Sequence, residues 1–372
     1  MSSGWPSYCQ QPSEVMPYGL CCYHYNGLVG PETVAHTPLG WASKDSAEDR
    51  RFAMVRLYAA GDKAVAVVDD GKVETALEGR GARCLAVAPE DPGTLYVGTS
   101  DEGLFKSADG GKSWEKLSGV GHARVTAVAV SAADGAVYAG TEPSALFVSR
   151  DGGASWRELE GMRHLPSAPT WSFPPRPWTS HVRAIAPSHA DPNLVVVGIE
   201  LGGVVRSTDG GESWQDQRPG AQADCHSLAA HRGDMGLLYE AGGGGFAQSR
   251  DFGDSWEAAD GGMDLRYAWG LAADAEDPSL VYASAASGPG RAHGGGPSNA
   301  AIYRRVASGR WEAVLEGLAA FPYALCPDPE AAGTLFAGLG DGTILRSQNS
   351  GEGWEEFGRV PAGLQSLSVV SA

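Results

Sequence analysis

Ser107-Ala-Asp-Gly-Gly-Lys-Ser-Trp114 is the first of five segments in this 372-residue chain that share the pattern S-x-D-x-G-x-x-W. The others begin at Ser149, Ser207, Ser249 and Ser347, and the last of them carries Asn in place of Asp. The pattern predicts a tight hairpin, because the Asp side chain accepts hydrogen bonds from amides of its own turn and the Gly supplies a positive φ. The Trp ring then packs between neighbouring sheets, so we interpret the segment as a folding device and not as a catalytic motif.

Around each hairpin the sequence repeats a unit of four short strands. The hairpins at Ser107 and Ser149 are 42 residues apart, and so are those at Ser207 and Ser249. Repeats of about 40–45 residues with four strands each indicate the blades of a β-propeller. The six complete units are predicted at residues 82–118, 123–160, 181–217, 224–258, 265–314 and 321–357.

A seventh blade is predicted from both ends of the chain. Residues 364–370 look like an innermost strand with no partners after it, and residues 54–77 look like three outer strands with no innermost one. Joining them closes the ring, which removes the open sheet edges that promote aggregation. The sequence therefore predicts an all-β fold: a seven-bladed β-propeller over residues 54–372, closed by the C-terminal strand joining the N-terminal blade.

The composition excludes several classes of protein. With 52 Gly and 23 Pro, the chain is too rich in turn formers for a helical bundle. Its net charge of −17 argues against binding to nucleic acid or to an anionic membrane, because both need clustered Lys and Arg. No apolar run reaches the roughly 18 residues of a membrane span. We therefore expect neither a nucleic acid nor a membrane as partner.

Residues 1–53 show neither strand alternation nor the repeat, and we interpret them as an irregular extension, either flexible or non-native. The segment lacks the basic and apolar regions of a secretory signal, and Pro6, Pro12 and Pro17 interrupt it. The cysteines beyond it lie far apart in apolar runs and show no zinc-binding spacing. We therefore expect a cytoplasmic protein.

Aligning the innermost strands of six blades brings polar and aromatic residues to two levels. The fourth position of the alignment holds Leu85, Thr126, Arg183, His226, Trp269 and Tyr323. The second position holds Arg83, Arg124, His181, Asp224 and Tyr267. Because the innermost strands surround the propeller axis, we expect these side chains to gather at one end of the central channel.

The ends of the second strands add carboxylates. The plain pattern, as in Tyr138-Ala-Gly-Thr141, has none, whereas the next two blades carry Glu200 and Glu240. We expect both carboxylates at the rim that holds Arg183 and His226. Buried carboxylates near such groups are costly unless paired, so the cluster is either a structural ion-pair network or a working site.

Two unusually long loops are predicted at the same rim. The loop of residues 161–180 connects two blades and contains Trp171 and Trp178, and the loop of residues 287–300 contains His293. Long loops gathered on one face of a rigid scaffold often carry function.

The first functional hypothesis is a hydrolase with a central pocket at this rim, acting on a glycoside or a small ester-like substrate. Glu200 or Glu240 would act as general acid or base with His226 as its partner. Arg183 would hold an anionic or carbonyl group of the ligand, a small or carbohydrate-like molecule. The remaining candidates for substrate binding are His181, Trp171, Trp178, Tyr267, Trp269, Tyr323, His293 and Arg124.

Two alternatives stay open. One adds a divalent metal, since His181, His226, Glu200 and Glu240 are acceptable ligands for zinc, manganese or iron, although no HxH or HxxxH spacing supports it. No other cofactor is predicted. The second alternative is a non-catalytic propeller that presents a ligand or binds a protein partner. A deep pocket with a shielded carboxylate and a His favours the enzyme, and a shallow face favours the scaffold.

The five hairpin segments match the Asp-box, also called the BNR repeat, and the chain resembles the sialidase-like BNR/Asp-box superfamily of β-propellers over most of its length. That superfamily includes sialidases, xyloglucan-cleaving glycosidases, sortilin-type receptors and a photosystem assembly factor, so the box specifies fold more strongly than function. Sialidases also carry a Phe/Tyr-Arg-Ile-Pro motif, which is absent here, and an arginine triad. Arg83, Arg124 and Arg183 could imitate a triad, but they do not share one column of the alignment, because Arg183 stands at the fourth position and the other two at the second. The resemblance implies a glycosyl-hydrolase-like member and not a sialidase.

Overall fold

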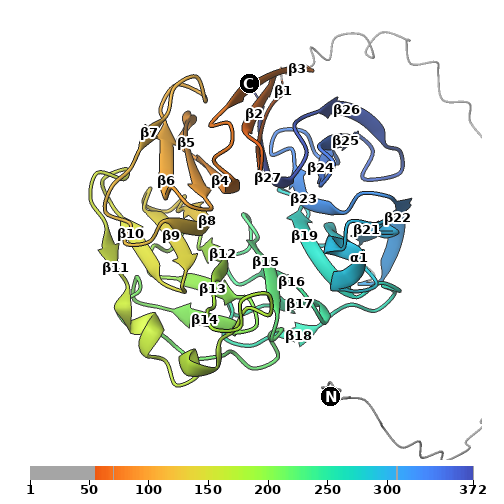
Figure 1. Ribbon diagram of the computed structural model, residues 1–372. Helices are drawn as coiled ribbons and strands as arrows, with labels where there is room; N and C mark the ends of the chain where they lie inside the picture. The colour runs from red at the N-terminus through yellow and green to blue at the C-terminus, as the bar shows by residue number, and fades with distance from the viewer. Residues whose placement is uncertain (1–54, 70, 307–308, 372) are drawn as a thin grey trace, which may run out of the picture. The chain divides into compact units, whose positions relative to one another are not determined.

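Seven small antiparallel sheets stand in a ring in the computed structural model, which confirms the predicted seven-bladed β-propeller (Figure 1). The structure describes residues 55–69, 71–306 and 309–371. The predicted N-terminal extension, residues 1–53, lies outside the described residues. In the part of the chain that the structure describes, no helix combines the length and apolar character that a membrane crossing needs.

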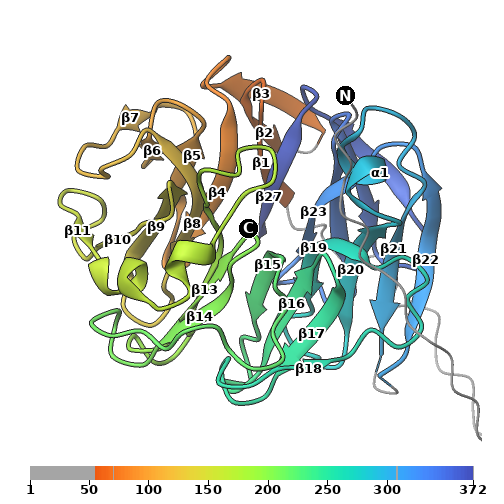
Figure 2. The same cartoon turned by 60° about the horizontal axis from the view of Figure 1, so that its bottom comes forward.

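The blades follow one another along the chain, apart from the first, which uses both ends (Figures 1 and 2). Blade 1 comprises β27 (Leu364–Ser371), β1 (Val55–Gly61), β2 (Val65–Asp69) and β3 (Lys72–Ala76). Blade 2 comprises β4 (Ala82–Ala88), β5 (Asp91–Thr99), β6 (Leu104–Ser107) and β7 (Glu115–Lys116). Blade 3 comprises β8 (Arg124–Val130), β9 (Val137–Glu142), β10 (Leu146–Ser149) and β11 (Arg157–Glu158).

The remaining four blades repeat this order, with one departure in blade 4. Blade 4 comprises β12 (Val182–Pro187), β13 (Val195–Ile199) and β14 (Gly203–Ser207), and its fourth strand is reduced to a bridge between Arg206 and Gln215. Blade 5 comprises β15 (Cys225–Ala230), β16 (Leu238–Gly242), β17 (Gly245–Ser249) and β18 (Glu257–Ala258). Blade 6 comprises β19 (Tyr267–Ala273), β20 (Val281–Ala286), β21 (Ala300–Arg305) and β22 (Trp311–Leu318). Blade 7 comprises β23 (Pro322–Pro327), β24 (Leu335–Leu339), β25 (Thr343–Ser347) and β26 (Glu355–Arg359).

The C-terminal strand closes the ring as predicted. β27 pairs antiparallel with β1, with Leu57 opposite Val369 and Ala59 opposite Leu367. Apolar side chains of β1, β2, β24 and β27 then share one buried cluster between blades 1 and 7. The two ends of the described chain therefore stabilise one blade together.

The repeated turn has the predicted hairpin chemistry. In its first copy Asp109 Oδ1 accepts a hydrogen bond from the Ser113 amide at 2.9 Å, and Ser107 Oγ accepts one from the Gly111 amide at 2.9 Å. Gly111 has φ +87°, and the Trp114 indole N–H donates to its carbonyl at 3.0 Å. Hydrogen bonds from the Ser113 hydroxyl and amide lower the pKa of Asp109 to about 2. The motif thus stabilises its own turn.

Each innermost strand carries a β-bulge that directs one side chain toward the propeller axis. At the bulge the pairing with the second strand skips a residue, which releases that residue from the ladder and bends the strand. The skipped residues are Arg83, Thr126, Arg183, His226, Trp269 (with Gly270), Tyr323 and Gln365. These seven positions form one level around the axis.

The strand pairing shows that the sequence alignment was wrong for the innermost strand of blade 2. The alignment placed Leu85 level with Thr126, but the pairing places Arg83 there, because Ala82 lies opposite Thr99 as Val125 lies opposite Thr141. The alignment was displaced by two residues. A shift of two keeps side chains on the same side of a strand, so the apolar pattern gave no sign of the error.

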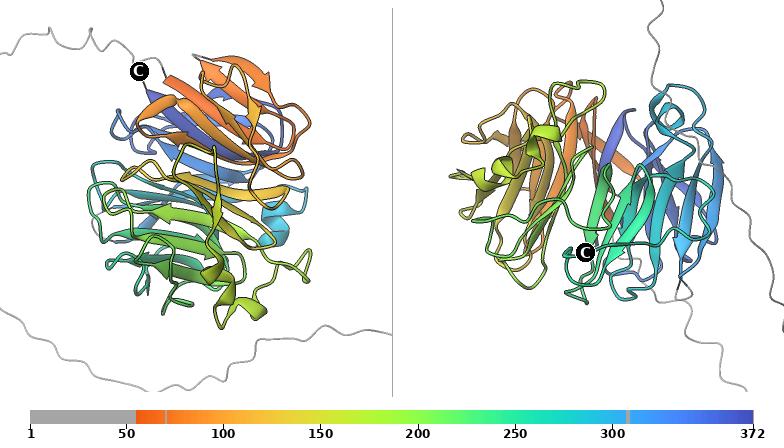
Figure 3. Two further views of the ribbon diagram at one scale, coloured as in Figure 1. Left: turned by 90° about the vertical axis from the view of Figure 1, so that its left-hand side faces the viewer. Right: turned by 90° about the horizontal axis from the view of Figure 1, so that it is seen from below.

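Two connections leave the sheets at one face of the ring. The loop of residues 161–180, which follows β11, contains two short 3-10 helices, η1 (Glu160–His164) and η2 (Ala168–Thr170). The connection from β20 to β21 contains α1 (Pro289–His293). In the right-hand view of Figure 3 the yellow-green loop and the blue turn of α1 both project from the upper face.

Candidate functional site

A central cavity of about 520 Å³ opens at the end of the ring where the innermost strands begin. Both long loops reach it, through Phe173–Arg176 of one and Pro289 and His293 of the other. From the strands and their ends it is lined by Arg83, Arg124, Thr126, Glu142, His181, Arg183, Glu200, Asp224, Tyr267, Trp269, Tyr323 and Gln365. The rim predicted to hold a site is therefore hollowed, and six of the seven bulge residues face this cavity.

Glu200 lines the cavity between His181 and Arg183. It directly follows β13, and its side chain is 11% exposed. Its Oε2 lies 3.0 Å from His181 Nε2 and 3.8 Å from Arg183 Nε. Burial opposes its ionisation, but the His181 hydrogen bond and the Arg183 charge outweigh burial and lower the pKa of Glu200 to about 2. Glu200 is therefore an anion over the whole physiological pH range.

His226 lies beneath the cavity surface, with a fully buried side chain. Its Nδ1 is 2.7 Å from the carbonyl oxygen of Ala268, which accepts only, so Nδ1 carries the proton and donates it. Its ring packs against Trp269 and Tyr267, with centroids 4.3 and 4.8 Å away. Backbone and aromatic contacts thus hold the imidazole in one orientation and one tautomer.

Asp224 is the partner of His226 and was not among the predicted site residues. Its Oδ2 lies 3.3 Å from His226 Nε2, a nitrogen that has no hydrogen-bond partner in the structure. The ligand atoms of Glu200, Asp224 and His226 all lie within 4.8 Å of one another. The available signal was the second position of the alignment, where Asp224 stands level with His181.

An aromatic wall faces this polar group. It consists of Trp269, Tyr267 and Tyr323 with His293 from α1, four of the residues predicted to contact a substrate, and all four line the cavity. The two ring nitrogens of His293 lie 3.0 Å from Tyr267 Oη and 2.9 Å from Tyr323 Oη. Partial burial, with the charges of His226 and Arg183, lowers the pKa of His293 to about 4. His293 is therefore neutral at pH 7 and ties the two tyrosines together.

Arginines supply the positive charge of the cavity. The Arg183 guanidinium stacks 4.3 Å from the centre of the Trp269 ring, and its buried Nε has no hydrogen-bond partner. Arg83 Nε donates to Ser100 Oγ at 2.7 Å, and its Nη1 lies 3.3 Å from Asp62. A stacked guanidinium with a free N–H is suited to bind an anionic or carbonyl group of a ligand.

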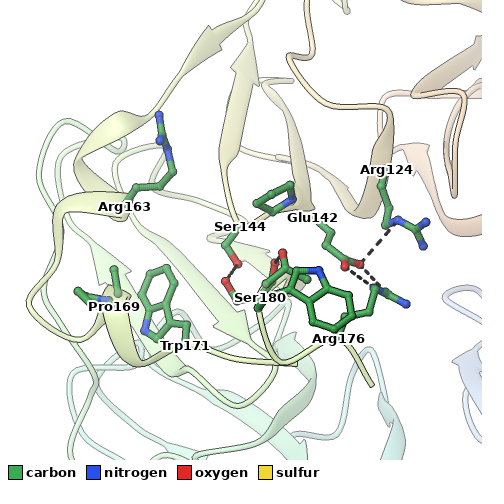
Figure 4. A pocket seen from close by; sticks show the side chains of 12 residues that line it. Arg124, Glu142, Ser144, Arg163, Pro169, Trp171, Arg176 and Ser180 are labelled. Atoms are coloured by element: carbon green, nitrogen blue, oxygen red, sulfur yellow. Dashed lines mark hydrogen bonds and ion pairs between the residues drawn. The ribbon is translucent and has the colours of Figure 1, made fainter. Parts of the chain in front are cut away.

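Glu142 is a second residue that the sequence analysis missed. It accepts two hydrogen bonds from Arg176 at 2.6 Å and lies 3.7 Å from Arg124 Nε, as Figure 4 shows. Burial opposes its ionisation, but the Arg176 hydrogen bonds together with the charges of Arg176, His181 and Arg124 outweigh burial and lower the pKa of Glu142. The quoted pattern ended at Thr141, one residue too early, and Glu142 occupies in blade 3 the place of Glu200 in blade 4. Blades 3 and 4 therefore both carry a glutamate at the end of the second strand.

Glu240 does not lie where the sequence analysis expected it. It faces Leu228 across the ladder, is 0% exposed, and accepts a hydrogen bond from the Gln222 amide at 2.9 Å. Burial raises the pKa of Glu240 to about 8. It lies neither in the cavity lining nor in the group formed by Glu200 and Asp224.

Trp171 and Trp178 also lie outside the central cavity. They line a second hollow of about 690 Å³, which Arg124, Glu142 and Arg176 also line (Figure 4). Trp171 is 8% exposed, and its indole N–H donates to Ser167 Oγ at 3.0 Å, whereas Trp178 is 79% exposed. The structure therefore does not bring these two candidates for substrate binding into the cavity that Trp269 lines.

The predicted metal ligands come together only in part. Glu200 and His226 belong to a group whose donor atoms converge, but its third member is Asp224, in place of Glu240. His181 contacts Glu200 from the other side through Nε2. Among residues 55–69, 71–306 and 309–371, this is the one cluster whose His, Cys, Asp and Glu donors converge in this way.

Comparison with known proteins identifies the fold. No family model matches the chain, and no curated protein matches it. Among solved structures, an ancestral GH74 enzyme superposes with a TM-score of 0.57 at 18% identity, covering 85% of this chain and 40% of its own. The GH74 xyloglucanase of Xanthomonas campestris gives 0.57 at 17% identity, with 82% and 46% covered. YCF48 bound to a D1 peptide gives 0.52 at 15% identity, with 82% and 86% covered.

These likenesses are to β-propellers of different function, some of which are glycoside hydrolases. The chain spans less than half the length of the first two GH74 enzymes and most of the length of YCF48. At these identities the likeness shows the fold alone.

Proposed function

We propose that the protein is a hydrolase whose substrate, a small ester or glycoside bearing an anionic group, binds in the central cavity. The observation that carries the proposal is the meeting of two chemistries in one cavity. On one side Asp224 and Glu200 line the cavity with the imidazole of His226 directly beneath them, and on the other lie Arg183 and the aromatic wall. The first group is suited to activate water, and the second to recognise a ligand.

The volume and charge of the cavity suit a small anionic ligand. A cavity of about 520 Å³ lies in the usual range for small-molecule sites, which is about 300–1,000 Å³. Arg124 and Arg176 share the single carboxylate of Glu142, and Arg183 has Glu200 3.8 Å away but an Nε that makes no hydrogen bond. Trp269 and Tyr323 offer ring faces and edges next to it, as a sugar or an aryl group requires.

His226 is the base best placed to take a proton from water. Its Nδ1 proton is donated to the Ala268 carbonyl, so the lone pair lies on Nε2, toward Asp224. Glu200, with a pKa of about 2, has no proton to donate near neutral pH and acts through its charge. This division of roles refines the general acid or base role that the sequence suggested for Glu200.

The likeness to GH74 enzymes supports a hydrolytic use of the fold, and the likeness to peptide-bound YCF48 supports the alternative of a binding propeller. A specific observation favours that alternative at a different place. The outer hollow beside Arg163 and the 79% exposed Trp178 offers a cationic and aromatic surface to a protein partner.

A panel of chromogenic substrates tests the proposal. It contains neutral glycosides, glycuronides, sialosides, carboxyl esters and phosphate esters, each with wild type, Asp224→Asn and Glu355→Gln. Glu355 is the control, because it pairs with Arg346 on the outer strand of blade 7. We expect turnover of an anionic member, lost in Asp224→Asn and retained in Glu355→Gln. A folded wild type that turns over none of them contradicts the hydrolase and favours the binding propeller.

A further inference from the structure

We propose that Glu200, Asp224 and His226 bind one divalent transition-metal ion at the floor of the central cavity. The inference deepens the proposed hydrolase and rests on it for the role of the ion. This set of ligands differs from the one suggested by the sequence. Asp224 takes the place of Glu240, and His181 is not a ligand.

The spacing of the three side chains fits a single ion. Their donor atoms lie within 4.8 Å of one another, and His226 Nε2 is 3.3 Å from Asp224 Oδ2. Ligand atoms at about 2.1 Å from a tetrahedral ion are about 3.4 Å apart. A small side-chain adjustment therefore places one ion in contact with an oxygen of Glu200, an oxygen of Asp224 and the nitrogen of His226.

The orientation of His226 is a second, independent observation. Its side chain is fully buried, its Nε2 points into the group without a hydrogen-bond partner, and its Nδ1 donates to a backbone carbonyl. Metal-binding histidines have this arrangement, in which a second hydrogen bond fixes the tautomer that presents the lone pair to the ion. Asp224 Oδ1 is likewise buried without a hydrogen-bond partner.

The charge balance also favours a cation. Glu200 is compensated by Arg183 and His181, whereas Asp224 has the anionic Glu200 nearby and, among the described residues, His226 Nε2 as its one ion-pair contact. A half-buried carboxylate facing a lone pair is costly, and a dication between them removes that cost. One imidazole with two carboxylates is a mixed ligand set that suits manganese, iron, cobalt or zinc.

Three protein ligands leave coordination positions open toward the cavity. An ion held in this way would lower the pKa of a bound water and supply hydroxide for hydrolysis, and it would replace His226 as the activator of water because it occupies the Nε2 lone pair. Arg183 lies on the same side and would face the group of the substrate that becomes negatively charged.

Calorimetric titration of chelator-treated, full-length protein with Zn²⁺ and with Co²⁺ tests the inference. Cys9, Cys21, Cys22, His24 and His36 can also bind metal, so the decisive quantity is the difference between full-length variants. The variants are Asp224→Asn and Glu200→Gln, which keep the side-chain shape. The matched control is Glu142→Gln, because Glu142 occupies the place of Glu200 in the neighbouring blade but pairs with Arg176.

We expect one equivalent of ion whose affinity falls at least about 100-fold in Asp224→Asn and Glu200→Gln and stays within twofold in Glu142→Gln. X-ray absorption at the zinc edge should report one imidazole nitrogen and oxygen ligands at about 2.0–2.2 Å. Thermal unfolding of each variant verifies that it is folded. Equal affinity in all four proteins, or no ion bound by wild type, overturns the inference.

The test also separates this inference from the hydrolase. Binding that depends on Asp224, with no turnover on any substrate, supports the metal site and contradicts the hydrolase. Turnover by metal-free protein that shows no Asp224-dependent binding contradicts the metal site and leaves the hydrolase standing.

Discussion

Glu200 directly follows β13 in blade 4 and Glu240 lies in the middle of β16, the equivalent strand of blade 5, and their surroundings are opposite. Glu200 faces the central cavity beside His181 and Arg183, which outweigh the effect of burial and lower its pKa to about 2. Glu240 is fully buried in blade 5 with one oxygen on the Gln222 amide, and burial raises its pKa to about 8. One carboxylate is held as an anion and the other favours its protonated form.

The difference comes from strand register. Glu240 lies opposite Leu228 in blade 5, just as Val197 lies opposite Ile185 in blade 4. Glu240 is therefore equivalent to Val197, which precedes Glu200 by three residues. A shift of an odd number of residues turns a side chain to the other face of a strand. Glu240 therefore shares the face of β16 with Leu238, which packs between blades 4 and 5. Proximity in an alignment does not place two side chains in one site.

The largest expected effect is on turnover, when a substitution of His226, next to the central cavity, is compared with one of Glu240, inside blade 5. With a substrate found in the panel, His226→Gln should lower kcat by about 10²–10⁴-fold, because a positioned base contributes about that much. Glu240→Gln should leave kcat within about twofold, because Glu240 is 0% exposed inside blade 5 and does not belong to the group formed by Glu200, Asp224 and His226. Steady-state kinetics on folded variants measure both. Equal losses in the two variants would contradict the separation of the regions.

The two tryptophans of the loop 161–180 allow a comparison of a buried side chain with an exposed one. Trp171→Ala should reduce the free energy of unfolding by about 3–5 kcal/mol, because Trp171 is 8% exposed within an apolar cluster. Trp178→Ala should change it by less than about 0.5 kcal/mol, because Trp178 is 79% exposed. Denaturant titrations compare them. A large effect of Trp178→Ala would show that the outer hollow is not an open surface.

Glu200→Gln should destabilise the protein at pH 7 by about 2–3 kcal/mol, because it leaves Arg183 without its buried counter-charge. The folded pKa of about 2 lies below the ordinary value of 4.5, so this stabilisation is present above pH 4.5 and is lost as the pH falls toward 2. Chemical denaturation at pH 7 and at pH 3 measures the decline. A variant as stable as wild type at pH 7 would refute the ion-pair account.

Glu240→Gln should have the opposite sign. The folded pKa of about 8 lies above the ordinary 4.5, so protonated Glu240 contributes its stability fully below pH 4.5, and that contribution is lost as the pH rises through 8. A neutral amide avoids this loss and should stabilise the protein by about 2 kcal/mol above pH 8 and hardly at all near pH 4.5. Thermal scans across this range test it. A stabilisation independent of pH would point to packing instead of charge.

Much of the central cavity could be predicted, because the innermost strands of a propeller must surround its axis. Arg183, Trp269 and Tyr323 lie at one level as aligned, and both long loops reach the same rim. Asp224 was visible in the alignment, but its closeness to Glu200 in the next blade was not. Glu142 escaped notice because nothing in the sequence marks Arg176, thirty-four residues later, as its partner.

The sequence by itself determined the seven blades, their hairpins and the closure by the C-terminal strand. These features depend on local chemistry, such as the hydrogen bond of Asp109 and the positive φ of Gly111 within one turn. They also depend on the sequence repeat, because each copy corresponds to one blade. The tertiary structure alone decided which residues share the cavity. Bulges shift the register of each innermost strand, and blade packing brings Glu200 of blade 4 next to His226 of blade 5. Both depend on contacts between strands far apart in the chain, which no local pattern records.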